Sequence, residues 1–148
     1  MPICSDLYYT HIMKLLMIYC DNFAYIPAHK TLESEPDCGE GNAINDAVIG
    51  FIHAEVVDED DPARVEKKLI KNLKWGARKN ATKRIVLHSF SHLAETKADA
   101  TFTRELLERA SQRLIHASYE AWQTPFGYFL DLDLQAPGRS TARIFKSF

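Results

Sequence analysis

The spacing of hydrophobic and polar residues divides the chain into short strands and two amphipathic helices. One of the strand candidates, residues 45–57, carries apolar and β-branched residues in succession, which indicates burial on both faces near its middle. Residues 29–43 are polar and rich in turn formers, and they predict a loop. Strand-length apolar runs predict the full set of strands at residues 14–20, 23–28, 45–57, 84–89, 119–124 and 128–135.

The first helix is predicted within residues 58–80. Asp61 is a suitable N-cap, and Pro62 occupies the first helical position, where its missing N–H costs nothing. Helical spacing places one apolar stripe at Val65, Leu69, Ile70, Leu73 and Ala77. The opposite side carries a basic stripe of Lys67, Lys71, Lys74 and Arg78.

The second helix is predicted within residues 99–117, and its buried stripe comprises Phe102, Leu106, Ala110 and Leu114. Two strands then flank Pro125-Phe126-Gly127 as a pair, and the tail after residue 135 has no clear period. Strands and helices alternate in the middle of the chain. This order predicts an α/β fold in which two main helices cover a mixed β-sheet.

Composition adds that the chain is one soluble globular domain. Its 148 residues are 46% hydrophobic and 26% charged, and no apolar run is long enough to span a bilayer. We find no signal peptide pattern, and the three cysteines are odd in number and widely spaced. We therefore expect reduced thiols, a cytoplasmic protein and no membrane partner.

The N-terminus contains a second methionine, Met13, which opens the strand-like run MKLLMIYC. We expect residues 1–12 to form an N-terminal extension and residues 13–148 to form a single domain.

Simple catalytic motifs are missing from the sequence, which contains no P-loop, GxGxxG, GxSxG or CxxC. The first chemical candidate is the stretch LHSFSHLAE, residues 87–95. It follows a strand, and ligands usually bind beyond the carboxyl ends of strands in α/β proteins. His92 could orient a substrate or move a proton there. The same residues are also consistent with a loop that is capped by hydroxyl groups and carries a surface histidine.

Two further readings of the reactive residues are weaker. A metal site would join His88 and His92 with His53 or Cys20, but residues four apart in an extended segment lie roughly 13 Å apart. Cys20 has no visible base partner, so a buried, inert thiol is favoured.

The basic stripe could contact phosphates, and the ordinary alternative is a solvated helix face.

Four stretches, MKLLMIYCDNFAY, AVIGFIHAEVVDEDDPARV, IVLHSFSHLAE and TPFGYFLDLDL, resemble successive blocks of one family. The family is the N-terminal editing domain of archaeal-type threonyl-tRNA synthetase, and we expect a freestanding member of it that acts in trans. The resemblance implies a D-aminoacyl-tRNA deacylase-like fold and hydrolysis of serine wrongly attached to threonine tRNA, without metal or cofactor. The substrate's own ribose 2′-hydroxyl would help to activate the water. The implied partners are the aminoacylated 3′ end of tRNA, a second copy of the chain and a threonyl-tRNA synthetase.

The resemblance also implies roles for individual residues. His92 matches a substrate-contacting histidine that we take as the catalytic candidate, and Ser91 precedes it at the pocket lining. The implied substrate-binding set is Ile52, His53, Ala54, Ser91, Phe126, Gly127, Phe129 and Leu130, and the tRNA-phosphate candidates are the basic stripe.

Phe129 and Leu130 depart from the family pattern, because they stand where the resemblance expects a tyrosine and a lysine. The family's later glutamate falls near Arg143. Leucine can neither donate a hydrogen bond nor carry charge, so the site is modified. Three functions stay open: trans-editing of mischarged tRNA with help from Asp131 or Asp133, an inactive module that binds aminoacyl-tRNA or adenosine, and a deacylase of D-aminoacyl-tRNA.

Overall fold

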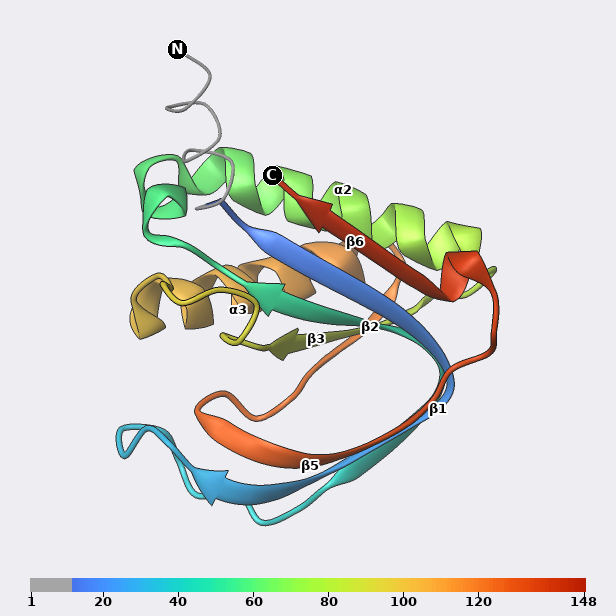
Figure 1. Cartoon of the computed structure of the whole chain (residues 1–148), viewed down its shortest axis with the longest axis horizontal. Coiled ribbons are helices and arrows are strands. Elements are labelled where there is room, and N and C mark those ends of the chain that lie inside the picture. The colour runs from blue at the N-terminus through green and yellow to red at the C-terminus, as the bar shows by residue number, and fades with distance from the viewer. Residues whose placement is uncertain (1–11) are drawn as a thin grey trace.

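A curved six-stranded sheet forms the centre of the protein (Figure 1). The computed structural model describes residues 12–148, so the predicted extension 1–12 lies outside the described residues except for Ile12. Across the sheet the strand order is β4–β3–β2–β1–β5, and β6 also pairs with β1. The strands are β1 (Lys14–Lys30), β2 (Asn42–His53), β3 (Arg84–Ser89), β4 (Glu120–Gln123), β5 (Tyr128–Gln135) and β6 (Arg143–Ser147).

Two helices, α2 (Pro62–Lys79) and α3 (Ala100–His116), cover one face of this sheet (Figure 1). β2, β3 and β4 are parallel, whereas β1 is antiparallel to each of its neighbours β2, β5 and β6. The predicted α/β class with a mixed sheet and two main helices is therefore confirmed. Neither helix within residues 12–148 has the length and apolar character that crossing a lipid bilayer requires.

β1 is one continuous strand, so the prediction of two separate strands at 14–20 and 23–28 is wrong. The polar residues Asp21 and Asn22 separate the two predicted strands, but Asn22 lies in register with Asn45 on β2 and Gln135 on β5. Ladder pairing on both sides keeps the backbone extended through this exposed point. The strand curves strongly, and its second half runs beneath the rest of the sheet with β5 (Figure 1).

The end of β2 also differs from the prediction, which extended the strand to residue 57. A 3-10 helix, η1 (Val56–Asp60), replaces its last part. The Asp58 carboxylate accepts hydrogen bonds from the backbone N–H groups of Glu55 and Met13, at 2.8 and 3.4 Å. Burial raises the pKa of Asp58, although these hydrogen bonds oppose the shift.

α2 forms where the sequence predicts it. The Asp61 side chain accepts a hydrogen bond from the Arg64 backbone N–H, and Pro62 is the first helical residue. All five residues of the predicted apolar stripe are buried. A Cβ at Gly76 would lie 2.8 Å from the Met17 sulfur, so the glycine allows this helix to approach the sheet closely.

α3 also matches its prediction within a residue at each end, although Phe102 is only half-buried. An ion-pair cluster joins the two helices, because the Glu66 carboxylate contacts Arg109 at 2.6 Å and Arg113 at 2.7 Å. These guanidinium groups hold the pKa of Glu66 below its usual value, against the effect of burial.

The chain after α3 departs most from the prediction. The strands on either side of Pro125-Phe126-Gly127 do not pair with each other, because β4 pairs with β3 and β5 with β1. The tail forms η2 (Ser140–Ala142) and β6, which the sequence did not suggest. At its end the Phe148 backbone N–H donates to the Met13 carbonyl at 3.0 Å.

Apolar side chains fill both faces of the central strands. One core lies between the sheet and the two helices. The second lies on the opposite face, inside the curve of the sheet, and is formed by Cys20, Phe23, Ile44, Ala47, Ile49, Phe51 and Val86. Every residue from Ala47 to His53 on β2 is buried, which confirms the predicted burial on both faces.

Candidate functional site

A cavity of about 290 Å³ opens where β2 and β3 end and β5 begins. Figure 1 shows the loop after β3 and the start of β5 at this same end of the sheet. Four segments contribute to the wall: residues 31–32, the β3 end with its following loop, the start of α3, and residues 125–132. The position agrees with the general placement of ligands in α/β proteins.

The loop between β3 and α3 carries Ser91 and His92, and backbone hydrogen bonds fix both its ends. The Phe90 N–H donates to the Ile52 carbonyl at 2.9 Å, and the Ala98 N–H donates to the Ala54 carbonyl at 2.8 Å. The end of β2 therefore serves as a template for the loop.

His53 binds the middle of the loop from behind. Its fully buried ring accepts a hydrogen bond at Nδ1 from the Leu93 N–H, at 3.3 Å, while Nε2 lies 2.6 Å from the Thr96 carbonyl oxygen. A carbonyl only accepts, so Nε2 carries a proton and donates it to the Thr96 oxygen. Glu55 lies 3.6 Å from Nε2 and accepts a hydrogen bond from the Thr96 hydroxyl at 3.0 Å.

The turn at residues 125–127 forms the opposite wall. Gly127 has φ +80°, the left-handed region that glycine adopts at little cost. Its carbonyl accepts hydrogen bonds from the backbone N–H groups of Thr31 and Leu32, at 2.7 and 3.3 Å. The neighbouring Tyr128 hydroxyl donates to the Pro36 carbonyl and accepts from the Cys38 N–H. These bonds join the start of β5 to the loop between β1 and β2.

His92 lies in a column of aromatic rings at the cavity. Its ring stacks on Phe129, with centroids 5.8 Å apart, and meets Phe90 edge-on at 5.1 Å. Phe129 stacks in turn on His29 of β1 at 6.4 Å. Both His92 and Phe129 are exposed, so the column lies at the mouth of the cavity.

His88 lies deeper, near the end of β3, and is buried. Its Nδ1 is 2.8 Å from the Thr124 hydroxyl, and its ring meets Phe51 edge-on at 5.2 Å. Burial, with a smaller contribution from His92, lowers the pKa of His88 to about 4. The ring is therefore neutral at pH 7.

The predicted site residues fall into two groups. Ile52, His53 and Ala54 lie behind the β3–α3 loop, where the two carbonyls and the imidazole already bind the loop. The cavity lining contains the other predicted members, namely Ser91, His92, Phe126, Gly127, Phe129 and Leu130.

The charge of the wall is limited to basic groups. No aspartate or glutamate belongs to the lining among residues 12–148, whereas Lys97 does. Asp131 and Asp133 alternate with the leucines of β5 and are exposed outside the lining. Leu130 lines the cavity, so this part of the wall is apolar.

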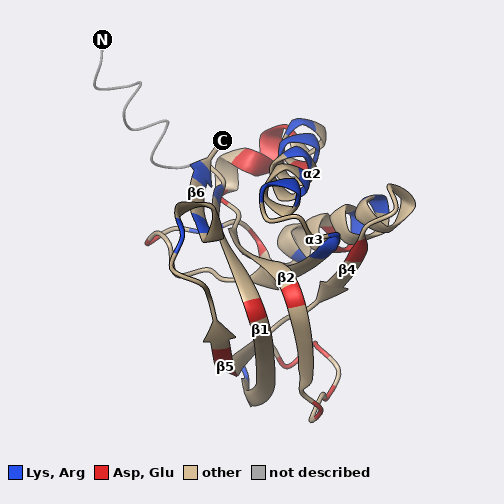
Figure 2. Ribbon diagram, turned by 90° about the vertical axis from the view of Figure 1, so that its right-hand side faces the viewer, with Lys and Arg blue, Asp and Glu red and all other residues tan. Residues whose placement is uncertain are grey.

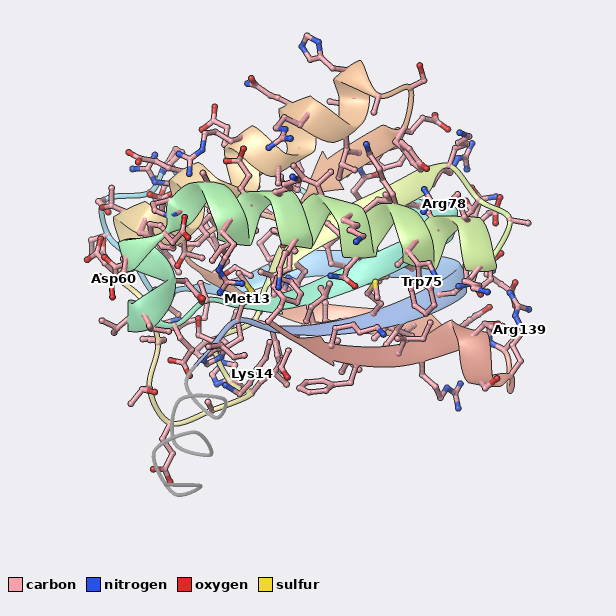
Figure 3. The ribbon with its side chains drawn as sticks, turned by 90° about the horizontal axis from the view of Figure 1, so that it is seen from above. Met13, Lys14, Asp60, Trp75, Arg78 and Arg139 are labelled. Atoms are coloured by element: carbon pink, nitrogen blue, oxygen red, sulfur yellow. The ribbon has the colours of Figure 1, made fainter. Side chains whose placement is uncertain are left out.

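Figure 2 shows the basic residues of α2 as blue bands along this helix. Lys67, Lys71 and Arg78 are exposed, and Lys74 is half-buried. Trp75, on the same helix, lies beneath the ammonium groups of Lys79 and Lys146, whose nitrogens are 5.7 and 4.8 Å from its ring. Figure 3 shows Trp75, Arg78 and Arg139 at the same end of α2. The positive surface thus extends from the helix to β6.

The residues of the metal hypothesis do not converge. Within residues 12–148, no three histidine, cysteine, aspartate or glutamate side chains are grouped so that they could hold an ion. Cys20 is buried in the second core, and burial raises the pKa of its thiol to about 11. The thiol is therefore protonated and unreactive at neutral pH.

Sequence comparison identifies the family to which these features belong. The profile described as "Archaea-specific editing domain of threonyl-tRNA synthetase" matches residues 13–148. The chain belongs to this family. It is 28% identical over 138 residues to the threonine–tRNA ligase of Thermococcus kodakarensis and 26% identical over 137 residues to that of Methanopyrus kandleri. Each alignment covers 91% of this chain but only 22% of the ligase.

Structure comparison supports the same fold. The c-Myc DNA Unwinding Element Binding Protein superimposes with a TM-score of 0.63 at 11% sequence identity, over 91% of this chain and 98% of that protein. Similarity at this level shows the fold alone. The editing-domain family and this architecture together confirm the expected D-aminoacyl-tRNA deacylase-like fold.

Several residues of this editing domain's cavity were not singled out from the sequence. Thr124 binds His88, and Thr31 and Leu32 bind the Gly127 carbonyl. Lys97 supplies a positive charge. Thr124, Thr31 and Leu32 are distant in sequence from the groups that they bind, so no local sequence pattern indicated these contacts.

Proposed function

We propose that this editing domain hydrolyses the ester of mischarged aminoacyl-tRNA in trans, with Ser-tRNA(Thr) as the preferred substrate and a modified active site. One observation carries the proposal: the cavity is bounded by the His92 loop and the Gly127 turn, in a chain of the threonyl-tRNA editing family. The cavity would receive the 3′ end of the tRNA with its amino acid.

The proposed chemistry needs few side chains. An aminoacyl ester is already reactive, so a protein accelerates its hydrolysis mainly by holding the ester, a water and the developing oxyanion in place. Serine lacks one methyl group of threonine, a difference worth only about 1–3 kcal/mol in a synthetic site. A second, hydrolytic site supplies the missing discrimination.

The proposed roles follow the positions of the side chains. His92, held against Phe129, would contact the aminoacyl group, and Ser91, Phe126 and Gly127 would line its pocket. The tRNA backbone would contact the basic stripe of α2 through its phosphates. We further propose that the domain acts as a homodimer and works beside a threonyl-tRNA synthetase in the cytoplasm.

A second candidate is a module that binds the aminoacyl-tRNA end without hydrolysing it. The apolar wall at Leu130, in a lining without carboxylates among the described residues, favours this candidate. Incubation of the purified protein with seryl-, threonyl- and D-aminoacyl-tRNA decides between the candidates. We expect faster ester loss from seryl-tRNA than from the other two. Ester loss at the buffer rate for all three, combined with retained tRNA binding, would identify the binding module.

The basic stripe has its own test. Charge reversal of Lys67, Lys71 and Lys74 should weaken tRNA binding and flatten its dependence on salt, because fewer counterions are released. Reversal of Lys30, Arg104 and Arg143, three basic residues outside α2, changes the net charge by the same amount and serves as the control. Equal effects of both sets would show that α2 has no specific part.

A further inference from the structure

His88 is the most enclosed ionisable group of the cavity wall. Only 6% of its surface is exposed, whereas the other ionisable side chains of the lining, His92, Lys97 and Tyr128, are exposed or half-buried. The Tyr128 hydroxyl already has two hydrogen-bond partners. A buried histidine that faces a cavity needs an explanation, because burial of a polar ring is costly unless its nitrogens are used.

One nitrogen of His88 is used within the protein. Nδ1 pairs with the Thr124 hydroxyl at 2.8 Å. Thr124 is itself buried, and its backbone N–H donates to the Leu87 carbonyl at 3.1 Å. The rings of Phe51 and Phe90 lie against the imidazole, with centroids 5.2 and 5.9 Å away. These contacts fix the orientation of the ring.

The other nitrogen, Nε2, has no hydrogen-bond partner among residues 12–148. Within the same residues, every fully buried side-chain nitrogen or oxygen has such a partner. Nε2 must therefore reach accessible space, and the space lined by His88 is the cavity. A fixed imidazole thus presents one nitrogen to the site.

We propose that His88 Nε2 holds the water that attacks the aminoacyl ester, and that Thr124 is the positioning residue that aims it. This inference rests on the proposed function. In the tautomer required, Nδ1–H donates to the Thr124 oxygen, and the Nε2 lone pair accepts a hydrogen bond from the water.

In the chemical step, His88 acts as a hydrogen-bond acceptor and does not take up a proton from the water. The water oxygen forms a bond to the ester carbonyl carbon, and the bond from this carbon to the ribose oxygen breaks. One water proton ends on the ribose oxygen, and the other leaves with the amino acid's carboxyl group and passes to solvent. A ring that stays neutral orients the water without trapping its proton.

The test is single-turnover deacylation of seryl-tRNA(Thr), with the protein in excess and its concentration varied. This design separates the maximal rate from the protein concentration that gives half of it. We expect His88→Leu to lower the maximal rate about tenfold or more, with the half-saturating concentration changed less than about twofold. Thr124→Val should lower the rate several-fold in the same manner. His88→Gln, whose amide oxygen can accept a hydrogen bond near the position of Nε2, should recover part of the rate.

The control is His116→Leu, an exposed histidine at the far end of α3, which should behave as the wild type. Thermal unfolding shows which variants are folded. If His88→Leu does not fold, the maximal rate of Thr124→Val tests the inference. An unchanged maximal rate in a folded variant overturns the inference alone. A raised half-saturating concentration at unchanged maximal rate also overturns it, because this result marks substrate recognition. Absence of hydrolysis by the wild type overturns the proposed function and this inference together.

Discussion

The His92 ring stacks on the Phe129 ring, at a centroid distance of 5.8 Å and an interplanar angle of 21°. An aromatic pair of this kind is worth about 0.5–1.5 kcal/mol. Phe129 is half exposed, so its main role is to orient His92 and not to fill the core.

Replacement of Phe129 by alanine should therefore release His92 while it leaves the fold intact. We expect the ring protons of His92 to shift in NMR spectra as the ring current of Phe129 is lost. Unfolding free energy should fall by about 1 kcal/mol or less. Phe145→Ala is a matched control, because Phe145 is 54% exposed and Phe129 is 52% exposed. Equal shifts of His92 in both variants would contradict the stack.

A side chain at position 127 is expected to destabilise the fold. Its φ of +80° is strained for alanine, and a Cβ would lie 2.9 Å from the Glu35 side chain and 3.0 Å from Leu32 Cβ. Gly127→Ala should lower the unfolding free energy by about 1–2 kcal/mol in urea denaturation. Gly39→Ala is the control, since nothing lies within 4 Å of a Cβ there. A Gly127→Ala protein as stable as Gly39→Ala would refute the strain.

His53 should be essential for the order of the loop that carries His92. His53→Leu removes two hydrogen bonds and leaves the Leu93 N–H and the Thr96 carbonyl without this partner. The loss should be about 2–4 kcal/mol, measured by urea denaturation. Amide exchange of residues 91–97 should accelerate more than that of α2. His116→Leu provides the exposed control. Uniform acceleration throughout the domain would instead indicate a general loss of stability.

The low pKa of His88 makes stability depend on pH. The folded pKa is about 4 and the ordinary value is 6.5, so between these values the unfolded chain binds a proton that the folded protein does not. The contribution is complete above pH 6.5 and is lost as pH falls toward 4, at about 1.4 kcal/mol per pH unit and about 3 kcal/mol in all. The nearby His92 makes a smaller contribution that also lowers the pKa of His88.

The measurement compares the wild type with His88→Gln, because both proteins keep the same carboxylates and their effect on stability cancels in the difference. The difference in unfolding free energy between the two proteins should change by about 3 kcal/mol from pH 7 to pH 4. A difference independent of pH would mean that His88 titrates normally in the fold.

Local signals in the sequence were sufficient for the helices and for β3. Asp61, Pro62 and the apolar stripe define α2 without any distant partner. β1 was divided incorrectly because Asp21 and Asn22 are polar, and only the pairing of Asn22 with β2 and β5 shows that the strand continues. β6 was missed for the same reason, since its short sequence becomes a strand by pairing with the first half of β1.

The cavity likewise combines residues that local sequence indicates with contacts that only the folded chain shows. Ser91, His92 and Gly127 belong to short motifs that can be compared with a family. The contacts that hold them join residues far apart in sequence: 36 residues for His88 and Thr124, 43 for His53 and Thr96, and 90 for Tyr128 and Cys38. No local pattern encodes such pairs, so their discovery required the folded chain.

The hydrogen bond between Phe148 and Met13 brings the last described residue beside the second. A domain whose two ends meet can be inserted into a host chain, or removed from it, without separating the segments on either side. The matched threonine–tRNA ligases are several times longer, with only 22% of their length aligned. The geometry of this one bond is thus suited to a domain that forms one part of a longer protein.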